Sequence, residues 1–119
     1  MNKIEIINIV LGYFSGFAER NVETVAKNFS DYIILDDWEG RWETKKDVKD
    51  AITSVFSNSD SLLIIPKDIQ VSVNGPKAVA TCRIDIIVNN KITLKVVDVI
   101  TLHDDFTGWF ITNIDAYKQ

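Results

Sequence analysis

The sequence predicts an α+β fold in which helices pack on one face of a strongly curved antiparallel sheet. Apolar residues recur at helical spacing mainly in the N-terminal half, whereas the C-terminal half reads as long strands joined by short turns. Helices and antiparallel strands that are separated along a chain form separate layers. Long strands in a chain of 119 residues also imply a sheet that bends around the first helix.

Three helices are predicted in the N-terminal half. The first is expected over residues 2–19, where two adjoining apolar stripes run along one side: Ile4, Ile7, Leu11, Phe14 and Ala18, and Ile6, Val10, Tyr13 and Phe17. A second, short helix follows Asn21, whose side chain suits an N-cap. A third runs from Thr44, another candidate N-cap, to about Phe56.

The rest of the chain reads as strands and turns. Residues 30–38 change from the helical period to the alternation of a strand, and residues 38–44 are expected to form a loop before the third helix. Four long strands follow, separated by Asn-Gly-Pro, Asn-Asn and Asp-rich turns, at 62–73, 77–88, 91–103 and 109–117. Turns this short pair neighbouring strands antiparallel, and we expect one domain over residues 1–119.

Composition restricts the classes of partner. A formal net charge of −4 and the lack of a basic patch argue against a nucleic acid. No stretch approaches the roughly 18 apolar residues of a membrane span, and Glu5 interrupts the apolar N-terminal run, so we expect a retained amphipathic helix and no membrane partner. Cys82 is the only cysteine; it suits a reducing cytoplasm and is expected to lie in the core.

No cofactor or metal is expected from the motifs. The sequence contains no Gly-rich phosphate loop, no Cys/His cluster and no Gly-x-Ser-x-Gly elbow. His103, the only histidine, is followed by Asp104 and Asp105 in a predicted hairpin turn. Acids are common in turns because their side chains bond to the local backbone, so these two are interpreted as turn formers.

The predicted strand 91–103 carries an acid on its apolar face. Side chains alternate across a strand, so Asp98 shares a face with Ile92, Leu94, Val96, Ile100 and Leu102. A carboxylate placed there must be paired, hydrogen-bonded or protonated, because burying it charged and alone costs more than raising its pKa. Two interpretations stay open: a structural acid bonded to Tyr13 or to backbone amides, and a polar group of a pocket.

Two further polar residues lie at the edge of the predicted core. Asp37 shares the alternation of Ile33 and Leu35 at the end of its strand, although a solvated strand end is the alternative. Tyr13 borders the apolar side of the first helix, where its hydroxyl group either reaches a cavity between helix and sheet or finds a partner in the core.

Over its whole length the sequence resembles the nuclear-transport-factor-2-like superfamily, which includes the SnoaL-like polyketide cyclases and the bacterial ketosteroid isomerases. The matching segments are the N-terminal YFSGFAERNVETVAKNFSDYIILDDWEG, the third helix TKKDVKDAI and the C-terminal FITNIDAY. The resemblance implies a cystatin-like α+β cone, in which the three helices of the N-terminal half pack on a strongly curved antiparallel sheet that encloses an apolar pocket.

Three positions match the residues that ketosteroid isomerases use for catalysis. Those enzymes place a tyrosine on the first helix, an aspartate at the end of the first strand and an aspartate on a late strand, which correspond to Tyr13, Asp37 and Asp98. The resemblance implies that Asp37 removes a proton next to a carbonyl group. Tyr13 and a protonated Asp98 would donate hydrogen bonds to the enolate oxygen. Trp38 stands where proline commonly follows the base.

The resemblance also implies a ligand and a partner. A small apolar or carbonyl-containing ligand would contact aromatic residues around the site, namely Phe17, Trp38, Trp42 and Phe56; packing is the alternative for both tryptophans. A homodimer would use the outer sheet face, which carries Val79, Thr81, Arg83, Val97 and Val99. Because this fold hosts many unrelated tasks, the alternative to an isomerase-like enzyme is a non-catalytic module that binds a ligand or a protein.

Overall fold

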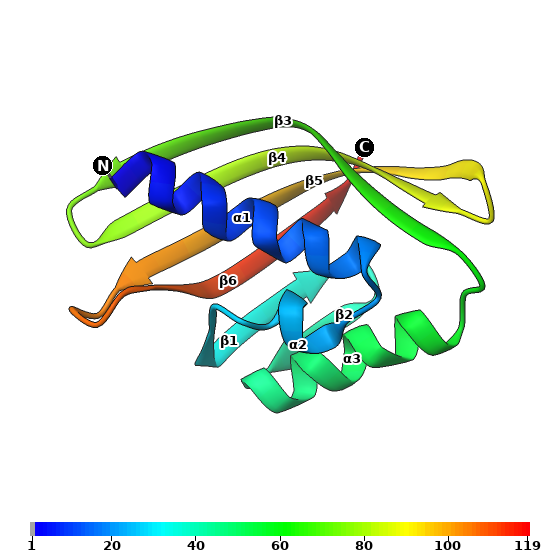
Figure 1. The fold of residues 1–119 in the computed structure, drawn as a ribbon, viewed down its shortest axis with the longest axis horizontal. Helices are drawn as coiled ribbons and strands as arrows, with labels where there is room; N and C mark the ends of the chain where they lie inside the picture. The colour runs from blue at the N-terminus through cyan, green and yellow to red at the C-terminus, as the bar shows by residue number, and fades with distance from the viewer. Residues whose placement is uncertain (1) are drawn as a thin grey trace.

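Three helices lie on one face of a six-stranded sheet in the computed structural model, which describes residues 2–119 (Figure 1). The helices are α1 (Asn2–Ala18), α2 (Val22–Val25) and α3 (Lys45–Ser57). The strands are β1 (Phe29–Asp37), β2 (Gly40–Glu43), β3 (Leu62–Asn74), β4 (Lys77–Val88), β5 (Lys91–Asp104) and β6 (Trp109–Lys118). The predicted order of elements is confirmed, and β2 is an addition to it.

The strands are ordered β2-β1-β6-β5-β4-β3 across the sheet. Neighbouring described strands run antiparallel except β1 and β6, which are parallel. A parallel connection needs a long stretch of chain between its strands, and α3 and the four strands β2 to β5 supply it here. The result refines the expectation of an antiparallel sheet: β1, from the N-terminal half, lies beside the C-terminal strand (Figure 1).

Bulges bend the long strands over α1. The β3–β4 register shifts between Pro66 and Asp68, and the β5–β6 register shifts between Thr101 and Leu102. An extra residue in one strand increases the local twist and lets the strand bend. The sheet therefore curves around the helices, as predicted, and stays open between its edge strands β2 and β3.

One side of α1 packs against the rest of the protein. This side buries the second of the two predicted stripes together with Phe14. That stripe consists of Ile6, Val10, Tyr13 and Phe17. Ile4 and Leu11, which the sequence also places on an apolar stripe, are 62% and 42% exposed. On the buried side α2 approaches closely at Gly16, where an added Cβ would lie 2.5 Å from the backbone nitrogen of Val25.

Both predicted helix caps are present. The Oδ1 atom of Asn21 accepts hydrogen bonds from the backbone N–H groups of Glu23 and Thr24, at 3.0 and 3.2 Å. The hydroxyl oxygen of Thr44 accepts one from the N–H group of Asp47, at 3.3 Å. These side chains satisfy N–H groups that have no partner inside the helix, which explains why α2 and α3 begin where they do.

The segment 38–44, predicted as a loop, contains β2 instead. β2 forms a hairpin with β1 in which Leu35 lies opposite Trp42 and Asp37 opposite Gly40. The carboxyl group of Asp37 accepts hydrogen bonds from the N–H groups of Glu39 and Gly40, at 2.7 and 3.2 Å, and so closes the turn. A strand of four residues is too short to give a clear alternation in the sequence.

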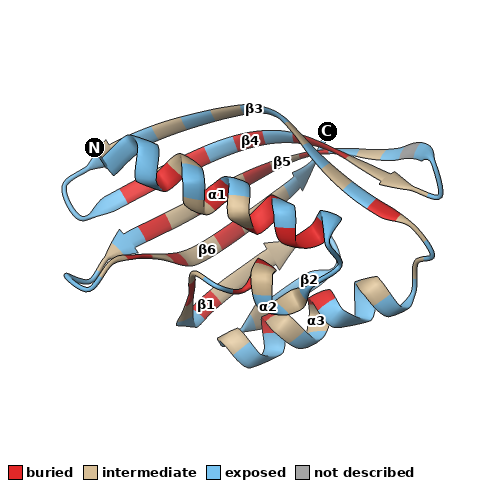
Figure 2. Ribbon diagram, in the orientation of Figure 1, coloured by how far each residue is buried: buried red, intermediate tan, exposed pale blue. Residues whose placement is uncertain are grey.

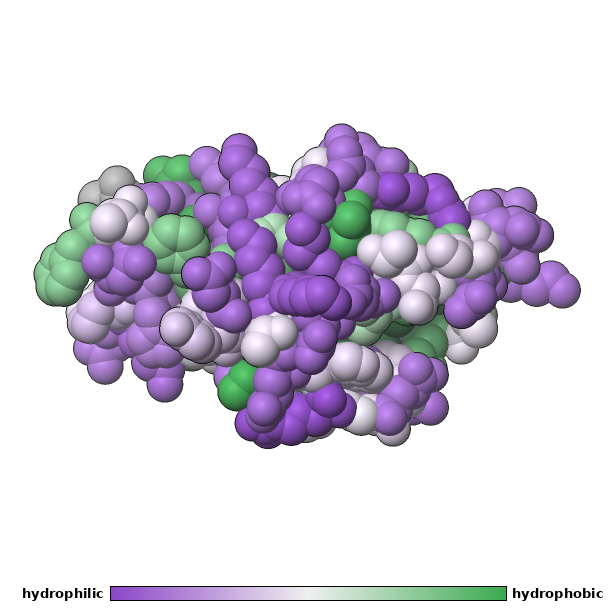
Figure 3. All heavy atoms as spheres, turned by 90° about the horizontal axis from the view of Figure 1, so that it is seen from below, coloured by the Kyte–Doolittle hydropathy of each residue, from purple (hydrophilic) through white to green (hydrophobic). Residues whose placement is uncertain are grey.

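The core lies between α1 and the sheet face that it covers, and Figure 2 shows buried positions on both. Cys82 is buried, as predicted, and so is Trp109 at the start of β6. Seen from the side of α3, the surface is mainly hydrophilic with scattered apolar side chains (Figure 3). Within residues 2–119 we find no helix with the length and apolar character needed to cross a membrane.

Candidate functional site

The inner face of the sheet brings Asp37 and Asp98 into one row. Asp98 on β5 lies opposite Cys82 on β4 and opposite Ala116 on β6. The parallel register of β1 and β6 places Asp37 beside Ala116. The two aspartates therefore flank Ala116, and their backbones are about 10 Å apart because neighbouring strands are about 4.8 Å apart.

Asp98 points into the core, as its place in the alternation predicts, and is 5% exposed. Within residues 2–119 its carboxyl group takes part in no hydrogen bond or ion pair, so the bond to Tyr13 or to backbone amides that a purely structural role would use is not formed. No polar side-chain atom of the described chain is both fully covered and without a partner. The unpartnered oxygens of this carboxyl group are therefore not fully covered.

Burial, and to a smaller extent the nearby charge of Asp37, raise the pKa of Asp98 to about 7. Both causes disfavour the carboxylate, the first by removing water and the second by like-charge repulsion. A carboxyl group with this pKa is partly protonated near neutral pH. It can then donate a hydrogen bond, which an ordinary exposed aspartate cannot do.

Tyr13 lies close to both acids from the helix side. It is 7% exposed, and its ring makes edge contacts with Phe14 and Phe17 at centroid distances of 5.1 and 5.2 Å. Its pKa is raised well above the ordinary value, first by burial and then by the charges of Asp98, Cys82 and Asp37. The hydroxyl group stays protonated and is a hydrogen-bond donor.

The carboxyl group of Asp37 is fixed on one side only. Its Oδ1 atom accepts both backbone hydrogen bonds of the β1–β2 turn, from Glu39 and Gly40. Its Oδ2 atom has no hydrogen-bond partner among the described residues. The half-buried side chain is thus held in position through one oxygen, and the other oxygen is free of protein partners in the described part of the chain.

The four aromatic residues predicted to contact a ligand lie in different surroundings. Phe17 on α1 meets Phe56 on α3 edge-on, with ring centroids 5.7 Å apart. Trp42 is half-buried and packs against the core, which agrees with the packing alternative. Trp38 is at the surface, where the Nζ atom of Lys118 lies 5.3 Å from its ring.

An arginine fixes the Phe17–Phe56 contact, which the sequence did not indicate. The guanidinium group of Arg20 lies 5.6 Å from the ring centroid of Phe56. The same group donates hydrogen bonds to the backbone oxygens of Phe56 and Ser59, the latter at 2.7 Å. It thereby binds the C-terminal end of α3 to the end of α1. The contact is formed by residues remote in sequence, so no local pattern reveals it.

Two surface hollows reach the predicted catalytic residues separately. A groove of about 760 Å³ runs along α1 and is lined by Tyr13, Gly12 and Ile111, among others. A smaller hollow of about 290 Å³ between the β1–β2 turn and the end of β6 is lined by Asp37 and Ala116, among others. Asp98 lines neither. The three polar residues are close enough for their charges to interact, whereas the two hollows reach only Tyr13 and Asp37, each from a different side.

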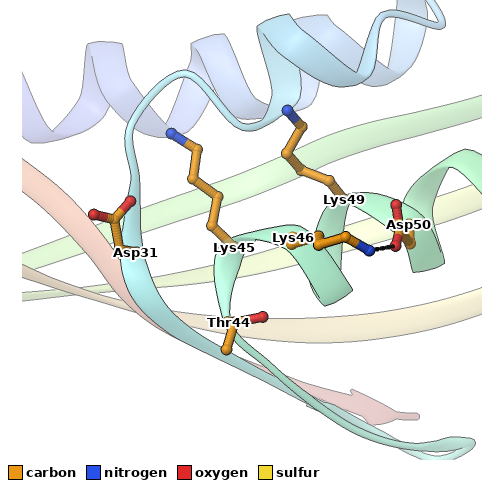
Figure 4. Close-up of a pocket in the computed structure, with 6 residues that line it drawn as sticks. All are labelled: Asp31, Thr44, Lys45, Lys46, Lys49 and Asp50. Carbon is orange, nitrogen blue, oxygen red and sulfur yellow. Dashed lines mark hydrogen bonds and ion pairs between the residues drawn. The ribbon is translucent and has the colours of Figure 1, made fainter.

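A third hollow, of about 430 Å³, lies at the start of α3 and is basic (Figure 4). The side chains of Lys45 and Lys49 extend toward the same side in this view. Lys49 forms an ion pair with Glu23 at 2.6 Å, and Lys46 forms one with Asp50 at 2.9 Å. The sequence signal was available, because lysines four residues apart lie on one face of a helix. This hollow contains none of the predicted site residues.

A model of the SnoaL-like domain matches residues 6–116 of the chain. The chain belongs to the SnoaL-like domain family. This confirms the resemblance drawn from the sequence, and it agrees with the three helices packed on a curved, open sheet. A search among curated proteins finds no match to the sequence.

Solved structures share the fold of this SnoaL-like protein over nearly their full length. A candidate dehydratase of the nuclear-transport-factor-2-like family from Streptomyces avermitilis is 14% identical, with 96% of this chain and 93% of that chain covered and a TM-score of 0.84. A candidate ketosteroid isomerase from Shewanella frigidimarina is 16% identical, with 92% and 91% covered and a TM-score of 0.80.

A third similar structure is named as an association domain and not as an enzyme. A candidate calcium/calmodulin-dependent protein kinase type II association domain from Thiobacillus denitrificans is 9% identical, with 93% of this chain and 92% of that chain covered and a TM-score of 0.82. At such identities the similarity establishes the fold alone, because one fold carries many activities.

Proposed function

We propose that this SnoaL-like protein binds a small carbonyl compound and catalyses proton transfer at the carbon next to the carbonyl group, in an isomerisation or a cyclisation. The supporting observation is Asp98, a buried acid with no polar partner whose pKa is raised to about 7, in the same row as Asp37. A carboxyl group that is partly protonated near pH 7 can donate a hydrogen bond to a developing enolate oxygen.

Each polar residue has one role in this proposal. Asp37 acts as the general base: its free Oδ2 atom takes a proton from the carbon beside the carbonyl group, and the electron pair of the broken C–H bond moves to the oxygen. Tyr13 and neutral Asp98 stabilise that oxygen with hydrogen bonds. The proton then returns from Asp37 to another carbon. The Phe17–Phe56 pair, Trp38 and Trp42 are the proposed apolar contacts of the ligand.

Exchange of hydrogen for deuterium tests the proposal without knowledge of the natural substrate. A panel of small enolisable ketones is incubated with the protein in deuterated buffer, and loss of the proton signal next to the carbonyl is followed by NMR. We expect exchange faster than in buffer alone, and a rate that falls as pH rises through about 7, because Asp98 then loses the proton that it donates.

Substitutions in β1 provide the control for this experiment. Asp37→Asn is expected to abolish exchange with little change in stability. Asp36→Asn is the matched change at the adjacent position, whose carboxyl group pairs with Arg41 at 3.1 Å, and it should leave the rate unchanged. A ketone panel with no exchange above the buffer rate at any pH contradicts the enzymatic proposal.

A non-catalytic binding module is the second candidate. It is favoured by one observation, namely that Tyr13 and Asp37 line different hollows and Asp98 lines neither of them. The similar structure named as an association domain agrees with a role in protein assembly. This candidate predicts a ligand or protein that co-purifies equally with wild type and with Asp37→Asn, and no exchange by either.

We also propose a homodimer formed through the outer sheet face. Val79, Val97 and Val99 on this face are half-buried, and Thr81 and Arg83 beside them are exposed. β-branched side chains on a broad sheet suit a self-complementary interface. Sedimentation of wild type as a dimer and of Val99→Lys as a monomer would support it; a monomeric wild type would contradict it. A cytoplasmic location is likewise proposed, from the single free cysteine.

A further inference from the structure

The row that contains Asp98 continues to Cys82 on the side away from Asp37. Across the inner face of the sheet the order is Ile69, Cys82, Asp98, Ala116 and Asp37. Side chains directly opposite each other in an antiparallel pair have Cβ atoms about 5 Å apart. Cys82 is 0% exposed, so its buried side chain closes the β4 side of the space beside the carboxyl group of Asp98.

The Cys82 side chain is neutral and is a poor hydrogen-bond donor. Burial first, and then the nearby charge of Asp98, raise the pKa of the Cys82 thiol to about 12. A thiol is only a weak hydrogen-bond donor, whereas a hydroxyl group in the same place would stabilise a carboxylate well. On the opposite side Ala116 offers a methyl group alone. Neither neighbouring strand therefore supplies a side chain that would hold Asp98 ionised.

We propose that Cys82 is a positioning residue for Asp98, whose sulfur atom fills the space on the β4 side, excludes water there and leaves the carboxyl group to face Tyr13 and Asp37. This inference rests on the proposed function, in which Asp98 acts as a neutral donor, and it adds the group that keeps the donor neutral.

The groups that surround Asp98 come from several elements, and burial and the charge of Asp37 are the causes that raise its pKa. Tyr13 faces it from α1, Asp37 from β1 and Cys82 from β4, while β6 contributes the apolar Ala116. Asp68 on β3 lies near enough to Cys82 to raise the thiol pKa as well. The described residues place no cation close enough to lower the pKa of Asp98 appreciably, so a substitution at position 82 should be visible in its titration.

Carbon-13 NMR of the side-chain carboxyl group tests the inference on the ligand-free, full chain. The Asp98 signal is identified by its loss in Asp98→Asn and is followed from about pH 4 to pH 9. Cys82→Ser should lower the pKa of Asp98 by about one unit, because the hydroxyl group donates to the carboxylate. Cys82→Val, which fills the space without a donor, should leave it at or above the wild-type value.

A matched control separates the effect of the position from that of a buried hydroxyl group. Ala80→Ser introduces the same group on the same strand and face, opposite Ile100 and one row away from Asp98, and it should leave the Asp98 titration unchanged. If Cys82→Ser does not fold, Cys82→Ala replaces it, and the water admitted beside Asp98 should again lower the pKa. Equal pKa values in the folded position-82 variants would overturn the inference.

The outcomes distinguish the inference from the proposed function. Shifted pKa values without any ketone exchange would leave Cys82 as the positioning residue and remove the enzymatic role. Ketone exchange together with unshifted pKa values in the position-82 variants would support the enzymatic role and remove the positioning role of Cys82. A purely structural cysteine would change stability alone, whereas the proposed role also moves the pH profile of exchange in step with the pKa of Asp98.

Discussion

Asp85 and Asp98 are almost equally covered, at 4% and 5% exposed, but their electrostatic surroundings are opposite. Asp85 lies on the outer face of the sheet, where Lys67 binds one carboxyl oxygen at 2.6 Å and Lys95 lies 4.0 Å from the other. The hydrogen bond from Lys67 lowers the pKa of Asp85. Asp98, on the inner face, has no such partner, and burial raises its pKa to about 7.

The difference shows that burial alone does not determine whether an acid is charged. Lysine side chains cover Asp85 at the surface of the sheet, so its charge stays close to water and is paired. Asp98 lies under α1 among apolar side chains, where its charged form is destabilised. Asp85 therefore supports the fold as an ion pair. Asp98 makes the folded state less stable at neutral pH, and in the proposed mechanism its protonated form is the hydrogen-bond donor.

The largest effect expected from this comparison is on catalysis. Asp98→Asn should lower the rate of ketone exchange by roughly 100-fold or less, because the amide still donates a weaker hydrogen bond to the enolate oxygen. Asp85→Asn, the same chemical change at an equally covered site, should leave the rate unaltered. Exchange rates of the two variants under identical conditions provide the measurement. Equal losses in both would show that the effect arises from general disruption.

A cation placed beside Asp98 should make it resemble Asp85. Ala116→Lys puts an ammonium group next to the carboxyl group across the β5–β6 register, and we expect the pKa of Asp98 to fall by about 2 units. Ketone exchange should fall with it at neutral pH, since the donor is ionised. Ala116→Met is the control of similar length without charge. NMR titration that gives both variants the wild-type pKa would contradict the interpretation.

The reverse change should make Asp85 resemble Asp98 to a smaller degree. Lys67→Met removes the hydrogen bond that chiefly lowers the pKa of Asp85, so that pKa should rise. Because an acid with a lowered pKa stabilises the fold above its unfolded pKa, stability at neutral pH should fall in this variant and change little in acid. Urea unfolding at both pH values measures this, with Lys91→Met as the surface control. A Lys67→Met stability change that is equal in acid and at neutral pH would argue against the ion pair.

Sequence patterns over a few residues correctly predicted the features of the fold and site that depend on near neighbours in the chain. The alternation of β5 placed Asp98 on the inner face, and the caps at Asn21 and Thr44 fixed where two helices begin. These features depend on neighbours within a few residues along the chain. The short strand β2 was missed because its four residues carry too little periodicity to be distinguished from a loop.

The arrangement of the site depended on contacts that no local pattern contains. The row of Asp37, Ala116 and Asp98 exists because β1 pairs with β6 across most of the chain length. The ion pair of Asp85 with Lys67 forms at a bulge, where an extra residue breaks the alternation from which facing residues are inferred. The sequence could therefore indicate candidate acids, and tertiary structure was needed to tell which of them has a partner.

The most direct test of the neutral acid is the free energy of unfolding of wild type and Asp98→Asn as a function of pH. In the folded wild type, Asp98 keeps its proton up to about pH 7. In the unfolded chain it loses the proton near its ordinary pKa of 3.8. Rising pH therefore removes about 4 kcal/mol of stability between these values. Asn carries no titrating group, so the stability of the variant relative to wild type should increase steadily from about pH 4 to pH 7 and then level off. A difference that stays constant over this range would contradict a buried, uncharged Asp98.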